Sequence, residues 1–354
     1  MPPPSPVGAA RPRGAAVGWT LVLAALGYLW AMIGICQARN TAPGRAAFLT
    51  AQNLYVPTAP HWIAAVVRAL SHHPALAVRA VLGFDLAVAL ACLVAVWAIW
   101  RRRPGHRGRW LAVGFGLLAA LSVCLNAYHT GSFLPPVRGT DLLDEGIPVD
   151  LVMAGLELGI AVALLDARPA GRGWAGRLGT ALVLLTFAYE WLVSAATKLG
   201  DPLWPRVFAA AAQAVARAGE YRWFDAAVAA IAVPDTRGVA AVIVVAEFAI
   251  GGAYLVLAAR ILAGDRARGR WGGGARMAGI VAAPLAGTLT AIYYLVHGGT
   301  LLPPEYIHFG YAVDGSLDFL MTATAPAVWV WAAGTRPAGG PSGLRGAETG
   351  PTAV

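Results

Sequence analysis

Residues 76–100 read LAVRAVLGFDLAVALACLVAVWAIW, an apolar stretch that holds only two charged side chains, Arg79 and Asp85. At about 1.5 Å per residue, a helix of this length crosses a hydrocarbon layer about 30 Å thick. Similar stretches recur from Ala16 to Trp331. Because a helix satisfies its own backbone hydrogen bonds inside a bilayer, the sequence predicts an all-α, polytopic membrane protein.

The composition agrees with a membrane protein. Of the 354 residues, 58% are hydrophobic and 13% are charged, whereas roughly a quarter are charged in a soluble domain. The net charge is +9, and every basic residue except Lys198 is an arginine. Most arginines fall in short loops between apolar stretches, where they set membrane orientation. We therefore expect a lipid bilayer and no nucleic acid as partner.

Eight spans fit the hydropathy pattern. We expect them at residues 16–37, 76–100, 109–128, 149–166, 178–198, 238–261, 277–296 and 316–334. Arginine clusters at 101–109, 168–177 and 266–276 occupy alternate loops, which the positive-inside rule places in the cytoplasm. Both termini of a cell-membrane protein then lie inside. Residues 1–15 and 335–354, rich in Pro, Gly and Ala, are predicted to be disordered tails.

An internal duplication divides the chain. HTGSFLPP at 129–136 recurs as HGGTLLPP at 297–304. In the same order along the chain, Tyr28 pairs with Tyr189, Trp30 with Trp191, Trp62 with Trp223 and Asp85 with Glu247. The sequence therefore predicts two four-helix units, 16–166 and 178–334. Four spans return the chain to its starting side, so the units are parallel repeats with a pseudo-twofold axis along the membrane normal.

Each unit has a long outer segment after its first span, at 38–75 and 199–237. Residues 208–230 within the second segment are amphipathic. Such a stretch suits a helix on the outer surface or a lid over the bundle.

Ionisable side chains inside spans are functional candidates, because each costs about 2.5 to 3.5 kcal/mol at the bilayer centre on insertion scales. Those within spans are Asp85, Glu157, Glu190 and Glu247, and those near the outer ends are Asp150, Asp318 and Lys198. The four acids within spans lie at one predicted depth, about 12 Å from the outer boundary. A single polar chamber open to the outer leaflet would explain this common depth.

Lys198 and Glu247 are expected to form a structural ion pair between two helices of the second unit. The first unit has Gln37 and Asp85 at the corresponding positions. The units have therefore diverged, and only the second retains both charged partners.

Two acids have no acidic counterpart in the other unit: Glu190 corresponds to Leu29, and Glu157 corresponds to Ala325. The shared scaffold does not require them. A carboxyl group in apolar surroundings favours its protonated form, which a Brønsted acid needs. Candidate catalytic residues are therefore Glu190, Glu157, Asp318 and Asp150. The alternative for each is a hydrogen bond between helices.

Candidate substrate-binding residues are aromatic rings and two histidines that lie near the outer ends of spans. They are Tyr189, Trp191, Trp30, Tyr28, Trp223, His129 and His297. The rings suit either an interfacial aromatic belt or a cavity for an isoprenoid chain or carbocation. The histidines suit a turn contact, a proton relay, a ligand head group or a metal.

We expect no metal or other cofactor. No spacing of histidine and carboxylate matches a zinc signature, and neither a GxGxxG after a strand nor a P-loop occurs. The three cysteines, Cys36, Cys92 and Cys124, form no CxxC pair and are expected to be buried thiols.

The second unit resembles a known family. YEWLVSAATKL at 189–199 and AEFAIGGAYLVL at 246–257 resemble the DoxX/DoxD-like family of small four-helix membrane proteins. The resemblance implies a membrane subunit of a quinone-linked oxidoreductase, such as thiosulfate:quinone oxidoreductase, which relies on partner proteins. The first unit resembles the family weakly, and a tandem fusion departs from its single-unit pattern.

Three hypotheses remain open. The residues favour a proton-initiated terpene cyclase that acts on a lipophilic prenyl substrate, because acids without a counterpart in the other unit occur together with aromatic rings. The resemblance favours the quinone-linked oxidoreductase subunit, with a membrane or extracytoplasmic protein partner and quinone as its ligand. Parallel repeats also suit a scaffold or a transporter.

Overall fold

The structure is a computed structural model. It describes residues 13–39, 56–57, 59–101, 105–130, 149–166, 173–218, 221–264, 270–296 and 312–334. These residues form eleven helices and no strand. The tail predicted at 335–354 lies outside the described residues, as do residues 1–12. The predicted N-terminal tail is wrong at residues 13–15, which belong to the first helix.

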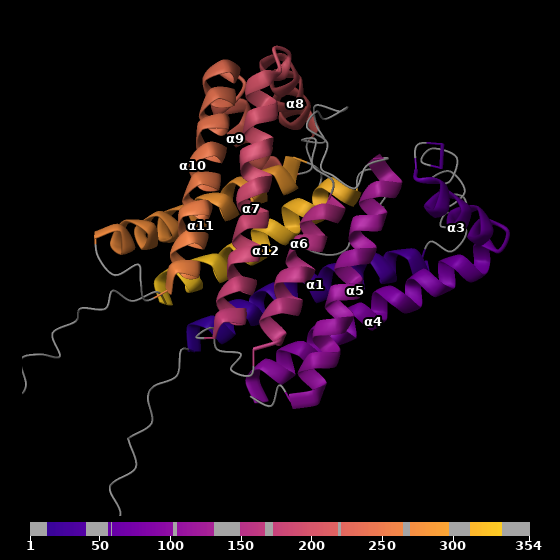
Figure 1. Cartoon of the computed structure of the whole chain (residues 1–354). Coiled ribbons are helices and arrows are strands. Elements are labelled where there is room, and N and C mark those ends of the chain that lie inside the picture. The colour runs from indigo at the N-terminus through magenta and orange to yellow at the C-terminus, as the bar shows by residue number, and fades with distance from the viewer. Residues whose placement is uncertain are drawn as a thin grey trace, which may run out of the picture.

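Each of the eight predicted spans is a helix (Figure 1). The helices are α1 (Arg13–Arg39), α4 (Pro74–Arg101), α5 (Gly105–Thr130), α6 (Val149–Leu164), α7 (Trp174–Gly200), α10 (Thr236–Ala263), α11 (Arg270–Val296) and α12 (Ala312–Gly334). Six of them contain a stretch long and apolar enough to cross a membrane: α1, α4, α5, α7, α10 and α11. The protein is therefore an all-helical, polytopic membrane protein.

Helix α6 is not among those six because it has 16 residues, about 24 Å of helix against a hydrocarbon layer of about 30 Å. Helix α12 is not among them either. Both are covered by other helices: Leu156 of α6 and Leu320 of α12 are fully buried. Eight helices thus match the predicted positions, although only six qualify as spans by length and composition.

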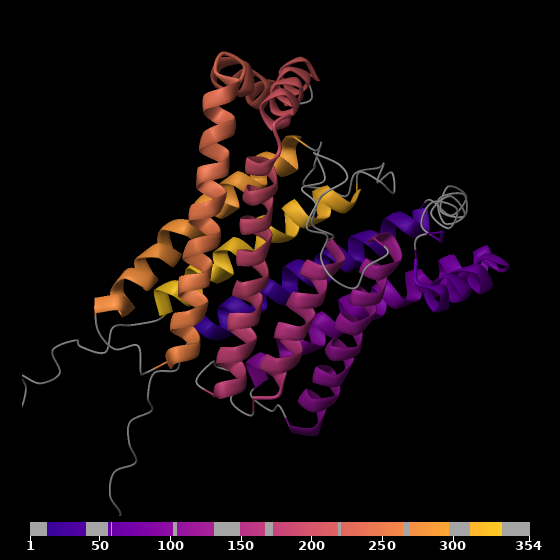
Figure 2. The same ribbon diagram turned by 45° about the horizontal axis from the view of Figure 1, so that its top comes forward.

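The long helices lie in two rows that are inclined to each other (Figures 1 and 2). The order in one row is α10, α7, α6, α5, and the order in the other is α11, α12, α1, α4; neighbours within each row pack against each other. Between the rows, α10 packs extensively on α11, whereas α4 and α5 contact each other only slightly.

The two predicted units share one core. Each unit contributes one helix pair to each row, so α6 of the first unit packs on α7 of the second, and α12 of the second packs on α1 of the first. The buried cluster accordingly joins Leu23 and Leu156 to Leu184, Ile250 and Leu320. The units are interleaved and do not form separate bundles.

Glycines bring the central backbones close together. A Cβ atom built on Gly179 of α7 would lie 2.5 Å from the carbonyl oxygen of Gly159 on α6. On α10, a Cβ atom on Gly251 would lie 2.7 Å from Leu192 of α7. Small residues allow membrane helices to pack at this distance, where dispersion contacts between them are strongest.

Three shorter helices lie in the outer segments: α3 (His61–Ser71), α8 (Trp204–Ala218) and α9 (Arg222–Ile231). Helices α8 and α9 pack on each other, and α8 packs on α10 (Figure 2). Asp235 fixes the start of α10 because its side chain accepts a hydrogen bond of 2.9 Å from the Gly238 N–H. Because α8 packs on α10, the α8–α9 pair covers one end of the α7–α10 pair.

Candidate functional site

A buried ion pair joins α7 to α10. The Nζ atom of Lys198 lies 2.5 Å from Oε1 of Glu247, and their side chains are 4% and 0% exposed. Lys198 is in the last turn of α7, and its side chain is buried in the bundle. A buried charge pair needs further hydrogen bonds to offset its lost hydration.

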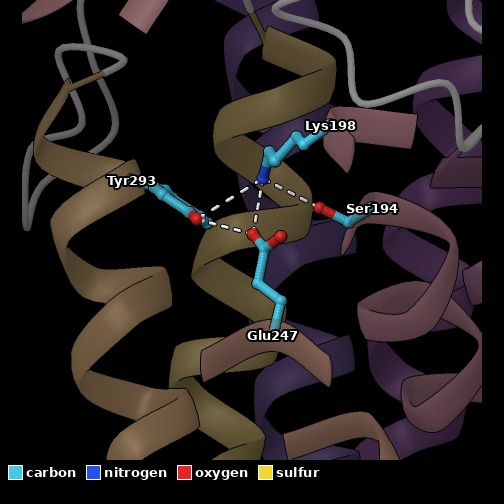
Figure 3. A network of polar contacts seen from close by, with 4 residues as sticks. All are labelled: Ser194, Lys198, Glu247 and Tyr293. Carbon is cyan, nitrogen blue, oxygen red and sulfur yellow. Dashed lines mark hydrogen bonds and ion pairs between the residues drawn. The ribbon is translucent and has the colours of Figure 1, made fainter. Parts of the chain in front are cut away.

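Two hydroxyl groups complete this network (Figure 3). Lys198 Nζ donates to Ser194 Oγ at 2.9 Å and to Tyr293 Oη at 3.4 Å. Tyr293 on α11 donates in turn to Glu247 Oε1 at 2.6 Å. Ser194 lies one helical turn before Lys198 and therefore on the same face. The four residues form one network across three helices, which we call the Lys198 network.

Two aromatic rings flank the ammonium group of Lys198. Its Nζ atom lies 4.9 Å from the centre of the Tyr293 ring and 5.1 Å from that of Trp204. Both distances suit cation–π attraction. Trp204 is the first residue of α8, so this contact also anchors the α8–α9 pair over the network.

An apolar cavity of about 280 Å³ lies beneath α8 and α9 and beside the Lys198 network. Its lining comes from four helices: Trp204, Phe208, Ala211, Ala212 and Val215 of α8, Phe224, Ala227, Val228 and Ile231 of α9, Val239 and Ile243 of α10, and Leu289, Ile292, Tyr293 and Val296 of α11, together with Ala232. Water gains few hydrogen bonds from such walls, so the cavity favours an apolar occupant. Tyr293 belongs to both the cavity wall and the network.

The two acids without acidic counterparts are buried elsewhere. Glu157 of α6 is 0% exposed, and its Oε2 atom accepts a hydrogen bond of 2.8 Å from Ser122 on α5. Glu190 is 2% exposed and lies on α7, about two turns before Lys198. Neither acid lines the cavity. The Glu157–Ser122 bond is the helix-to-helix contact considered as the alternative to catalysis.

The remaining candidate acids are distributed over other helices. Asp85 of α4 is buried, and its Cβ atom packs against Gly34 of α1. Asp150 is half-buried in the first turn of α6, and Asp318 is buried on α12. None of the three lines the cavity beneath α8 and α9. The cavity beneath α8 and α9 is lined by apolar side chains. It is therefore not the polar chamber that the common depth of the acids predicted.

The predicted aromatic residues divide into two sets. Trp30 and Trp191 are buried in the core, whereas Tyr28, Tyr189 and Trp223 are exposed. Trp30 packs edge-on against Phe84. None of these five residues lines the cavity. Outside the described residues lie His297 and the side chain of His129.

The aromatic lining of the cavity was not among the candidate binding residues. Trp204, Phe208, Phe224 and Tyr293 line it and were all missed. A signal for the first two was present, because they are one helical turn apart in the amphipathic outer segment. Their position opposite α10 and α11 depends on tertiary packing.

In the described part of the chain, no three His, Cys, Asp or Glu side chains are grouped so that they could hold a metal ion. Cys92 is buried, Cys124 is half-buried, and both are free thiols.

No protein-family model, curated protein or solved structure matches this chain.

Proposed function

We propose that the protein lies in the cell membrane as two parallel four-helix repeats, with eight spans and both termini in the cytoplasm. The equivalent packing of α1 on α4 and α7 on α10 supports the repeat. The arginine clusters in alternate loops support the orientation. The cavity and the Lys198 network then face the outer leaflet.

The proposed ligand is a neutral lipophilic molecule with an oxygen atom at its head. The observation that carries this proposal is the position of Tyr293, between an apolar cavity and the Lys198–Glu247 pair. One positive and one negative charge give the network no net charge, so it suits a neutral head group. A hydrocarbon tail suits the apolar lining, and in this proposal a carbonyl head accepts the Tyr293 O–H in place of Glu247 Oε1, which accepts it in this structure.

A prenylated quinone meets these requirements. Lys198 and Glu247 are also the residues on which the DoxX/DoxD-like resemblance rests, which supports a quinone-linked membrane oxidoreductase subunit. Reduction of a quinone to a quinol takes up electrons and protons in equal number. In this proposal a protein partner supplies the electrons, while the Lys198 network positions the quinone oxygen and hands on protons.

Quinone binding can be tested on the purified chain without a partner. A short-chain ubiquinone analogue is titrated while tryptophan fluorescence is recorded. Tyr293→Phe is expected to weaken binding about five- to tenfold, because one hydrogen bond contributes about 1 kcal/mol. Tyr294→Phe, whose ring packs on Phe319 outside the cavity, is the matched control. Equal affinity in wild type and Tyr293→Phe would contradict the proposal.

A proton-initiated terpene cyclase is the second candidate. The burial of Glu157 and Glu190 supports it, since both acids are held inside the helix bundle. Membranes that contain the protein are incubated with prenylated alkenes and epoxides, and isomeric products of unchanged mass are sought. Cyclised product in wild type that disappears in Glu190→Gln, Glu157→Gln or Asp318→Asn supports a cyclase; product retained in all three contradicts the acid assignment.

A further inference from the structure

Three arginines from three helices lie at the end of the second unit opposite α8 and α9. Arg177 is in the first turn of α7, Arg260 is in the last turn of α10, and Arg276 is in the second turn of α11. All three side chains are half-buried. The proposed orientation places this end at the cytoplasmic leaflet.

The chain reversal after α10 makes room for Arg177. Gly264 has a positive φ of 55°, and its N–H donates a hydrogen bond to the carbonyl oxygen of Arg260. A Cβ atom on Gly264 would lie 2.5 Å from Nη1 of Arg177. The missing side chain therefore lets the Arg177 guanidinium group pack beside the end of α10.

Arg260 and Arg276 are close enough to repel each other electrostatically. The Nε atom of Arg276 is buried and has no hydrogen-bond partner. Packing two like charges together and burying an unsatisfied donor are both unfavourable. The carboxylate of Asp166 accepts a hydrogen bond from the Gly176 N–H beside Arg177. An anion bound beside Arg260 and Arg276 would lower their mutual repulsion and accept a hydrogen bond from the Arg276 Nε–H.

We infer that these arginines bind the phosphate group of an anionic phospholipid from the surrounding leaflet. Guanidinium groups match phosphate oxygens with paired hydrogen bonds, and basic pockets between membrane helices suit lipid head groups. The neighbouring Trp174, Leu262 and Met277 are exposed apolar side chains. They provide a surface for the acyl chains, which free phosphate would not use.

Lipid binding can be measured by native mass spectrometry of the full-length protein released from neutral detergent. Phosphatidylglycerol and phosphatidylcholine are supplied separately, and inorganic phosphate is added to the phosphatidylglycerol sample as a competitor. We expect at least fivefold more bound phosphatidylglycerol than phosphatidylcholine. The double variant Arg260→Gln/Arg276→Gln is expected to lose that preference. Arg206→Gln/Arg237→Gln, which removes two exposed arginines at the opposite end, is expected to retain it.

Arg276→Lys keeps the positive charge but loses the paired hydrogen-bond donors of the guanidinium group. This single variant replaces the double variant as the test if the double variant does not fold. We expect it to lower the preference at least twofold. Equal binding of the two lipids by wild type, displacement of phosphatidylglycerol by equimolar inorganic phosphate, or full preference in the folded variants would each overturn the inference.

Discussion

Lys198 and Glu247 contact each other across the α7–α10 interface with 2.5 Å between Nζ and Oε1. In the first unit, Gln37 and Asp85 occupy the corresponding sequence positions on α1 and α4. The two predicted units therefore differ at this pair of positions, because a glutamine in the first unit replaces the lysine that forms the ion pair in the second. This difference makes the second unit the place to test function.

Removing one partner of the ion pair should destabilise the protein strongly. Lys198→Met leaves Glu247 as an uncompensated buried charge, with an expected cost of about 3–5 kcal/mol. Lys198→Met/Glu247→Met removes both charges and should recover much of that loss. Thermal unfolding in detergent measures the difference. A double variant less stable than Lys198→Met would show that the pair does not behave as a compensated buried charge.

Filling the cavity should block ligand binding without unfolding the protein. Ala212 on α8 lines the cavity, and Ala212→Phe places a ring inside it. We expect at least tenfold weaker binding of the quinone analogue, with helical content unchanged by circular dichroism. Ala210→Phe is the control because Ala210 is exposed on another face of α8. Similar losses in both variants would mean that the cavity is not the binding site.

A matched pair of glycines tests the central packing. Gly179→Ala introduces a Cβ atom 2.5 Å from the Gly159 carbonyl oxygen and should cost about 1–3 kcal/mol. Gly252 of α10 has no atom within 4 Å of such a Cβ, so Gly252→Ala should be neutral or stabilise the helix by up to about 1 kcal/mol. The midpoint of thermal unfolding compares the two. Equal midpoints would contradict the close approach of α6 and α7.

The orientation can be checked by cysteine labelling in intact cells. A membrane-impermeant maleimide should label Gln213→Cys on α8, whose site is exposed on the proposed outer side. Trp174→Cys, at the start of α7 and also exposed, should react only after permeabilisation. The wild-type chain controls for its own cysteines. The reverse pattern would invert the proposed topology.

Hydropathy located all eight long helices because a membrane helix is specified by local composition: its backbone hydrogen bonds are internal, and its side chains need only be apolar. Residues 76–100, for example, fall within α4. The same reasoning also made α6 a span, although its 16 residues give only about 24 Å of helix. The candidate site was predicted in part: Lys198 and Glu247 were paired, since a charge buried in a membrane needs a partner.

The sequence by itself determined which segments are helices and where charge is buried, and it predicted the duplication, because these properties depend on composition and spacing along the chain. Only the tertiary structure decided that the two units interleave in two rows, that Tyr293 of α11 joins Lys198 and Glu247, and that α8 and α9 enclose an apolar cavity beside them. These relationships depend on side-chain shape and on contacts between residues distant in sequence. Helical periodicity specifies which face of a helix is apolar, but it does not specify which other helix covers that face.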